Sequence, residues 1–351
     1  MVRIRGWLVA GVLSVGLVAA CKKDEPAAGT SAGDTAKKVD PTQVEQPSPG
    51  PTAKIKSSAN VSDLALLPVD AELVMGVNFA QVQQSALWKQ FVEPMLLKGD
   101  VAAKLGELEA KCGFDPMTAV KSLSVGVRGL GTATLDGVAV VHGIEKAQLV
   151  TCLDKVKADT TNLEITQDGD VTSVKGKNGK TIAFSFINDT TALVLIGASA
   201  TPAGVKQAAA GTSALQTSQA FVEMYNKINT QDSVWLLMNG KAKVFEKVAS
   251  LMKPQAVYGS INVSDGLTVD LRVRVDSPDQ ATQLAQGAKQ QASAAASMFP
   301  IDKLDINSDG SDIKVAVAVS AAKLEGLITQ ISGMVRGRMG GMGGMGGMGS
   351  P

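Results

Sequence analysis

Three kinds of residue are scarce in this sequence, and each scarcity argues against a class of function. Aromatic residues make up 4% of the chain, so a stacking platform for sugars or nucleic-acid bases is not expected. His142 is the only histidine, and the sequence shows no partner with which it would form a nucleophile–base pair. Basic and acidic residues nearly balance, at 34 and 33, which argues against a nucleic-acid partner.

Motifs that usually carry chemistry are missing as well. The sequence contains no P-loop, no zinc-ligand spacing and no nucleophile elbow. An enzyme would have to use carboxylates such as Asp136, Asp168 and Asp309, but these are scattered at turns, where turn geometry already explains an Asp-Gly pair. We therefore expect no catalytic residue and no cofactor.

The N-terminus has the layout of a secretory signal. Arg3 and Arg5 precede an apolar run that is shorter than the roughly 20 residues of a membrane-spanning helix. The run ends in Leu17-Val18-Ala19-Ala20-Cys21, which resembles the lipobox of bacterial lipoproteins. The resemblance implies that residues 1–20 are cleaved off, that Cys21 carries acyl chains such as palmitate, and that these chains anchor the protein to a membrane outside the cytoplasm. An uncleaved N-terminal anchor is the alternative.

The residues after Cys21 bear on the location within the cell envelope. In bacterial lipoproteins an aspartate at this point favours the inner membrane; here the residue is Lys22, so the resemblance implies the outer membrane rather than the inner one. Residues 22–60 are rich in Pro, Ala, Ser, Thr and Lys, and they have too few large apolar residues to offset the entropy of ordering. We expect the segment 21–60 to be a lipidated, disordered tether.

Two further cysteines follow the tether. Cys112 comes after a helical pattern at 101–111, and Cys152 lies within another at 145–157. Because the space outside the cytoplasm is oxidising, a disulfide between them is the favoured prediction. Two separate buried thiols remain the alternative, since distance cannot be read from sequence.

The body of the chain contains two pairs of similar segments. Leu163–Gly169 and Leu304–Gly310 are similar alternating segments that both end in Asp-Gly, a hairpin-turn dipeptide. Leu73–Asn78 resembles Val234–Asn239, and each is an apolar segment that ends at Asn. The similarity of these segments predicts a duplicated unit, with one repeat at 61–211 and a second at 212–332. The first repeat has an additional hairpin at 171–186.

The fold class follows from alternation. Val269, Leu271 and Val273 alternate with charged residues, which predicts strands with one dry face and one wet face. Helices are expected between the strands, two of them with Thr201-Pro202 and Ser277-Pro278 as helix starts. We therefore predict an α+β fold, in which antiparallel sheet carries helices packed on one face. These two helices are expected at 202–209 and 278–297, and a last helix is expected at 321–331.

One segment begins like a calcium-binding loop. Asp305, Asn307 and Asp309 have the spacing of the first ligands, followed by Gly310. Ala316 then stands where a bidentate glutamate is needed, and the flanking segments are strands rather than helices. A solvated hairpin turn is therefore preferred over a calcium site.

The C-terminal tail, residues 333–351, repeats Met-Gly-Gly. Its glycine content argues against stable structure, and we expect disorder. Soft thioethers at this spacing are candidates for Cu(I), and a weakly adhesive interaction tail is a third alternative. The tail also resembles the Gly-Gly-Met repeats that end group I chaperonins, but the likeness does not imply chaperonin function. The methionines concerned are Met339, Met342, Met345 and Met348.

These observations favour a membrane-anchored, non-catalytic lipoprotein of the cell envelope that binds a partner protein or serves as a surface scaffold. A carrier or chaperone for an apolar ligand, such as lipid or an acyl chain in a cavity between sheet and helices, is the alternative. The expected contact with the membrane is through lipid on Cys21.

Overall fold

The computed structural model describes residues 61–326, except 133, 160–162, 177–178, 213, 248–252 and 297–299. Its helices are α1 (Val61–Leu64), α2 (Phe79–Gln84), η1 (Trp88–Val92), α3 (Glu93–Leu96), α4 (Gly99–Cys112), α5 (Pro116–Ala119), α6 (Lys146–Asp159), η2 (Gly197–Ser199), α7 (Pro202–Ala209), η3 (Ala214–Thr217), α8 (Gln219–Tyr225), η4 (Lys243–Lys247) and α9 (Pro278–Ala296). Residues 321–326 are also helical. None of the described helices combines the length and apolar composition needed to cross a bilayer.

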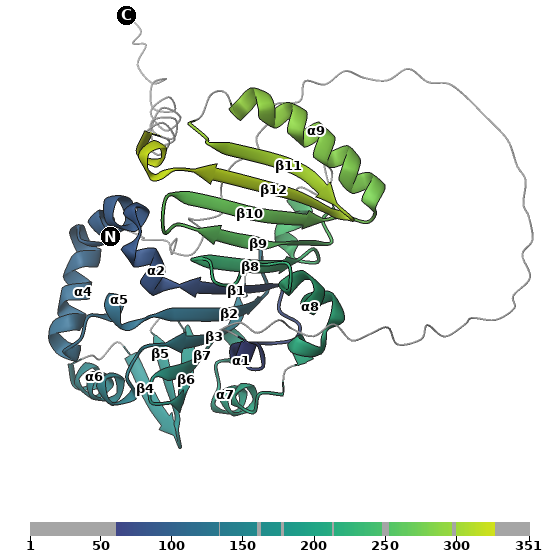
Figure 1. Cartoon of the computed structure of the whole chain (residues 1–351). Helices are drawn as coiled ribbons and strands as arrows, with labels where there is room; N and C mark the ends of the chain where they lie inside the picture. The colour runs from purple at the N-terminus through teal and green to yellow at the C-terminus, as the bar shows by residue number, and fades with distance from the viewer. Residues whose placement is uncertain are drawn as a thin grey trace, which may run out of the picture. The chain divides into compact units, whose positions relative to one another are not determined.

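The strands form one sheet, which Figure 1 shows with its helices. Every paired neighbour is antiparallel, and the order is β11-β12-β10-β9-β8-β1-β2-β3-β7-β6-β5-β4. The α+β class and the antiparallel sheet predicted from the sequence are confirmed. The strands are β1 (Leu73–Asn78), β2 (Ser122–Arg128), β3 (Asp136–His142), β4 (Leu163–Asp168), β5 (Val171–Gly176), β6 (Thr181–Asn188), β7 (Thr191–Ile196), β8 (Val234–Asn239), β9 (Ala256–Asn262), β10 (Leu267–Arg274), β11 (Lys303–Asp309) and β12 (Asp312–Val319).

The two predicted repeats share this sheet and meet where β1 pairs with β8. Moving outward from that seam, the first half runs β1-β2-β3-β7 and the second runs β8-β9-β10-β12. Met75 pairs with Leu236, the residue that matches it when the two Asn-ending segments are aligned. The seam thus relates the halves by an approximate two-fold axis. This arrangement is what a duplication would produce, and the duplication itself stays a prediction.

The hairpin turns, helix starts and additional hairpin that the sequence predicted are present in the structure. Gly169 and Gly310 have φ of 60° in the turns of the hairpins β4–β5 and β11–β12, a conformation that glycine adopts without steric cost. Thr201 Oγ1 accepts a hydrogen bond from the Gly204 amide at 3.0 Å, which caps α7. Ser277 Oγ accepts one from the Gln280 amide at 3.2 Å and caps α9. The strands β5 and β6 form the additional hairpin of the first half.

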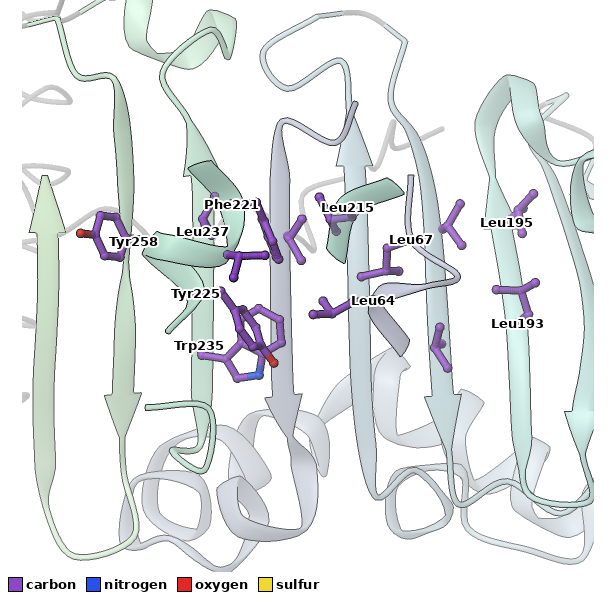
Figure 2. Packing of buried hydrophobic residues seen from close by; sticks show 14 of the residues in the cluster. Leu64, Leu67, Leu193, Leu195, Leu215, Phe221, Tyr225, Trp235, Leu237 and Tyr258 are labelled. Atoms are coloured by element: carbon purple, nitrogen blue, oxygen red, sulfur yellow. The ribbon is translucent and has the colours of Figure 1, made fainter. Parts of the chain in front are cut away.

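The main core lies on one face of the sheet, beneath α1, α7 and α8. Figure 2 shows Leu64 and Leu67, Phe221 and Tyr225, and Trp235 and Leu237 packed over the central strands. Leu193 and Leu195 extend this core across β7, and Val205 of α7 covers them with no exposed surface. Burial of large apolar side chains at about 25 cal/mol per Å² is the main stabilising contribution here.

Helices cover both faces of the sheet, so the prediction that they pack on one face is wrong. Tyr258 lies in the main core, and its cross-strand partner Arg272 shares its face. The next residue, Val273, therefore lies on the opposite face, where it packs with Ala281 and Ala285 of α9. The apolar stripe of α9 is buried against Val273 and Ile313, which the main core leaves uncovered.

Candidate functional site

Two rows of paired residues, most of them polar, cross the two halves of the sheet at corresponding positions. Each row starts at the Asn that ends the first strand of its half and crosses three further strands through directly paired residues. Paired residues point to the same face of a sheet, so each row is a line of neighbouring side chains. The rows are Asn78, Ser122, His142 and Thr191 in the first half and Asn239, Ala256, Arg274 and Asp312 in the second.

The second-half cluster surrounds Asp312, which is 1% exposed. One carboxylate oxygen accepts hydrogen bonds from Lys227 Nζ and from the Tyr258 hydroxyl, both at 2.6 Å. The other oxygen accepts from Arg274 Nε at 2.8 Å, and the Arg274 guanidinium lies 5.6 Å from the centre of the Tyr258 ring. Two cations and one hydroxyl therefore satisfy this buried carboxylate.

These contacts shift the pKa values of the group. Burial raises the pKa of the Asp312 carboxyl, but the hydrogen bonds from Arg274, Lys227 and Tyr258 outweigh burial and hold that pKa well below its usual range. Burial and the neighbouring Asp312 carboxylate raise the pKa of Tyr258 far above its usual value. The cluster is thus an ionised carboxylate with a neutral tyrosine at every physiological pH.

The first-half cluster surrounds Asp63 of α1, which is 2% exposed. Its carboxylate accepts a hydrogen bond from Ser124 Oγ at 2.7 Å and lies 3.0 Å from His142 Nε2. His142 Nδ1 lies 3.2 Å from Thr191 Oγ1. Ser124 stands two residues beyond the β2 partner of His142, just as Tyr258 stands two residues beyond the β9 partner of Arg274. The hydrogen bond with Asp63 raises the pKa of His142, against the effect of burial.

This arrangement does not provide an activated nucleophile. Ser124 donates to Asp63 instead of to His142, and it is 1% exposed. A triad needs the histidine between the nucleophile and the carboxylate, because the histidine takes the proton of the nucleophile. His142 therefore acts here as a structural partner of Asp63, which joins α1 to the sheet.

The three scattered carboxylates considered for an enzyme do not come together. Asp136 accepts hydrogen bonds from the backbone and side chain of Ser199, at 2.8 and 2.6 Å, and pairs with Arg128. Asp168 ends β4 and Asp309 ends β11, which are the opposite edges of the sheet. With strands about 4.8 Å apart, those edges are separated by roughly 50 Å, so these carboxylates have no shared chemistry.

The candidate calcium residues lie along the strand β11 instead of in a loop. Alternate residues of an extended strand are about 7 Å apart, so Asp305, Asn307 and Asp309 cannot converge on one ion. Asn307 Nδ2 donates to Asp305 at 3.2 Å, and Asp309 accepts from Arg272 at 2.8 Å. In the part of the chain that the structure describes, no group of three or more His, Cys, Asp or Glu is placed to hold a metal.

Cys112 and Cys152 form a disulfide that joins the end of α4 to α6, with Cα atoms 4.3 Å apart. Both residues are buried. The bond therefore stabilises the packing of these two helices and leaves neither sulfur as a free nucleophile. The lipidation candidate Cys21 and the copper candidates Met339, Met342, Met345 and Met348 lie outside the described residues.

The charged side of β10 is not a simple solvent face, contrary to the sequence-based expectation. Arg272 and Arg274 are only 12% and 22% exposed, and both form ion pairs with β11 or β12. Asp270 pairs with Lys314 at 3.2 Å in the same way. Sequence reasoning missed this group. The signal was present in the complementary alternation of β12, where Asp312 and Lys314 are two residues apart.

A small cavity lies at the seam of the two halves, where β1 ends and β8 begins. It has a volume of about 190 Å³ and is lined by Trp235, by the ends of β1 and β2, and by residues 230–232 before β8. It lies at the end of the central strands, beside the filled layer between sheet and helices. No protein family model, curated protein or solved structure matches this chain.

Proposed function

We propose that this chain is a lipid-anchored lipoprotein of the cell envelope that works by binding a partner protein and has no catalytic activity of its own. The observation that carries the anchor is the lipobox-like segment that ends at Cys21, with a short apolar run before it and a Pro-rich segment after it. Several acyl chains on one residue would hold the protein firmly, where a single chain binds only marginally.

The described body supports a binding role over a catalytic one. Its buried carboxylates, Asp63 and Asp312, and their partly exposed partners, His142 and Arg274, are held in hydrogen bonds that connect structural elements. A binding surface is available in the segment η1–α3, taken here as residues 88–97 so that it includes Leu97, the residue that follows α3. Met95 and Leu97 there are 74% and 66% exposed, and the nearby Val92 is also exposed. Exposed apolar side chains that gather on one segment are typical of protein-binding sites.

The carrier alternative receives less support from the described residues. A lipid or acyl chain needs a cavity of about 300 Å³ or more with an apolar lining. The layer between the sheet and α1, α7 and α8 is filled by side chains such as Leu67, Leu193 and Val205, which have no exposed surface. The cavity at the seam is smaller, and several of its lining residues are polar.

Metabolic labelling with an alkyne palmitate analogue tests the anchor. The wild-type protein should incorporate label and sediment with membranes, and Cys21→Ser should do neither. The sorting prediction has its own control, because Lys22→Asp should move the protein from the outer to the inner membrane fraction. Unlabelled wild-type protein that still sediments with membranes would point to the uncleaved anchor.

Site-specific photocrosslinking in cells tests the binding surface. A photoreactive residue at Met95 should give a discrete adduct that contains a second protein, because an apolar partner surface would cover this position. The matched control is Val69, which is 54% exposed and lies outside η1–α3. Adducts that contain only a second copy of the chain, or equal yields at both positions, would contradict the proposal.

A further inference from the structure

A row of apolar side chains crosses the second half of the sheet on the face that carries α9. Val317, Val269, Ile261 and Val234 are directly paired from β12 across β10 and β9 to β8, so their side chains are neighbours on one face. All four are only half-buried. Among the described residues, none of the four belongs to a group of tightly packed apolar side chains. This apolar row is therefore a part of the face that α9 leaves without a cover.

The opposite face of the same strands is charged. Asp270, the residue after Val269, pairs there with Lys314 at 3.2 Å, and Arg272 pairs with Asp309 at 2.8 Å. Placing an apolar segment over these ion pairs would remove charged groups from water without replacing their hydrogen bonds. An apolar segment that packs at this end of the sheet therefore has one suitable surface, the apolar row.

The last part of the chain begins beside this row. β12 ends at Val319, two residues after Val317. The Asp302 carboxylate accepts a hydrogen bond from the Ser320 amide at 2.5 Å and pairs with Lys323 at 2.7 Å. Residues 321–326 are helical, and Leu324 among them is 4% exposed; Figure 1 shows this short helix at the end of β12. The start of the helix is thus fixed at the end of the sheet where the row lies.

The sequence beyond residue 326 continues an apolar stripe. Leu327, Ile328 and Ile331 follow Leu324 at the spacing of one helix face, and they lie outside the described residues. A helix over 321–331 would be about 16 Å long. Strands lie about 4.8 Å apart, so β9 is about 10 Å from β12 in the sheet. Such a helix is long enough to reach from β12 across β10 to β9.

We propose that the segment 327–331 docks within its own chain on the apolar row, with its apolar stripe against Val317, Val269 and Ile261. Burial of apolar surface on both sides stabilises the contact. The inference goes beyond the proposed partner binding, since it neither requires nor involves the lipid anchor or the η1–α3 surface.

A photoreactive residue at Ile328 of the full-length chain, irradiated in intact cells, tests this contact. The adduct should have the mass of one chain and should join residue 328 to the tryptic peptide that ends at Arg272 and contains Ile261 and Val269. The matched control is the next residue, Thr329, whose side chain would point away from the stripe on a helix, so its yield with this peptide should be much lower.

Every other outcome of this experiment would overturn the proposal. An adduct with the mass of two chains would assign the row to a second copy, and an adduct with a different protein would assign it to a partner. Equal yields at the two positions, or no adduct at Ile328, would show that the segment makes no defined contact with the row.

A charge placed in the row tests the other side of the contact. Val269→Asp should remove most of the adduct formed at Ile328, because docking would bury the new carboxylate. Thr268→Asp adds the same charge at the adjacent position, which is exposed on the opposite face, and should leave the yield unchanged. An unchanged yield in Val269→Asp would contradict the proposal. If that variant fails to fold, the comparison of Ile328 with Thr329 in the otherwise wild-type chain still decides.

Discussion

Each half of the sheet has a buried carboxylate at its row of paired residues, but the carboxylate comes from β12 in the second half and from α1 in the first, and different groups satisfy it. In the second half Asp312 is held by Arg274, Lys227 and Tyr258. In the first half Asp63 is held by Ser124 and His142. Arginine and lysine stay charged at neutral pH, whereas histidine loses its charge there. The corresponding rows therefore carry a permanent ion pair in the second half and a titratable one in the first.

Replacing the second-half carboxylate, Asp312, should have the largest effect on the free energy of unfolding. Asp312→Ala leaves Arg274 and Lys227 without their shared partner in a partly buried site, which should lower the free energy of unfolding by about 3–5 kcal/mol. Urea denaturation measures the change. The control is Asp309→Ala on the same hairpin, whose carboxylate is 59% exposed and should contribute under about 1 kcal/mol. Equal losses would show that burial does not distinguish the two aspartates.

Among the described residues, only the first half contains a disulfide. Its removal should cause the second largest loss of stability. The replacement of both Cys112 and Cys152 by Ser reopens a loop with a sequence separation of 40 and should cost about 2–4 kcal/mol. Thermal unfolding with and without a reductant measures this: reductant should destabilise the wild type but not the double variant. Two titratable thiols in the unreduced wild type would contradict the bond.

The first-half carboxylate should contribute less than Asp312. Asp63→Asn retains a hydrogen-bond acceptor for Ser124 but removes the charge beside His142, so we expect a loss of about 1–2 kcal/mol. The measurement is the free energy of unfolding near pH 6, where His142 carries most of its charge. A loss as large as that of Asp312→Ala would mean that charge in this cluster is worth as much as in the other.

The smallest effect is a dependence on pH. Since Asp63 raises the pKa of His142 above its unfolded value, the contribution of this pair is complete below about pH 6.5 and is lost as pH rises through the folded pKa. The free energy of unfolding should therefore fall by less than about 1 kcal/mol between pH 6 and 8, because His142 is partly exposed. His142→Gln should reduce the change of the free energy of unfolding with pH. If that change is the same in the variant, another group is responsible for it.

Much of the fold was predictable because its signals are local. The segments Leu73–Asn78 and Pro202–Ala209 form β1 and α7 with the expected limits. The Asp-Gly pairs mark two hairpins, because glycine at φ near 60° is the least costly way to close such a turn. These features depend on residues that are close in the chain, so one sequence suffices to predict them.

The prediction of helices on one face failed for a physical reason. Alternation along β10 shows that one side is apolar and the other charged, but it does not show which side the main core covers. The main core in fact lies on the charged side, where ion pairs with β11 and β12 neutralise Arg272 and Arg274. The apolar side then needs α9 as its own cover.

The sequence by itself determined the turns, the strand and helix limits and the resemblance to a lipoprotein signal, since each depends on neighbouring residues. Only the tertiary structure decided which polar groups meet. His142 and Asp63 are 79 residues apart, and Lys227 and Asp312 are 85 apart. The Trp235 indole fits over the seam because Gly76 stands opposite it and has no side chain. Such contacts depend on which strands pair and in which register, and a residue pattern within one strand does not contain that information.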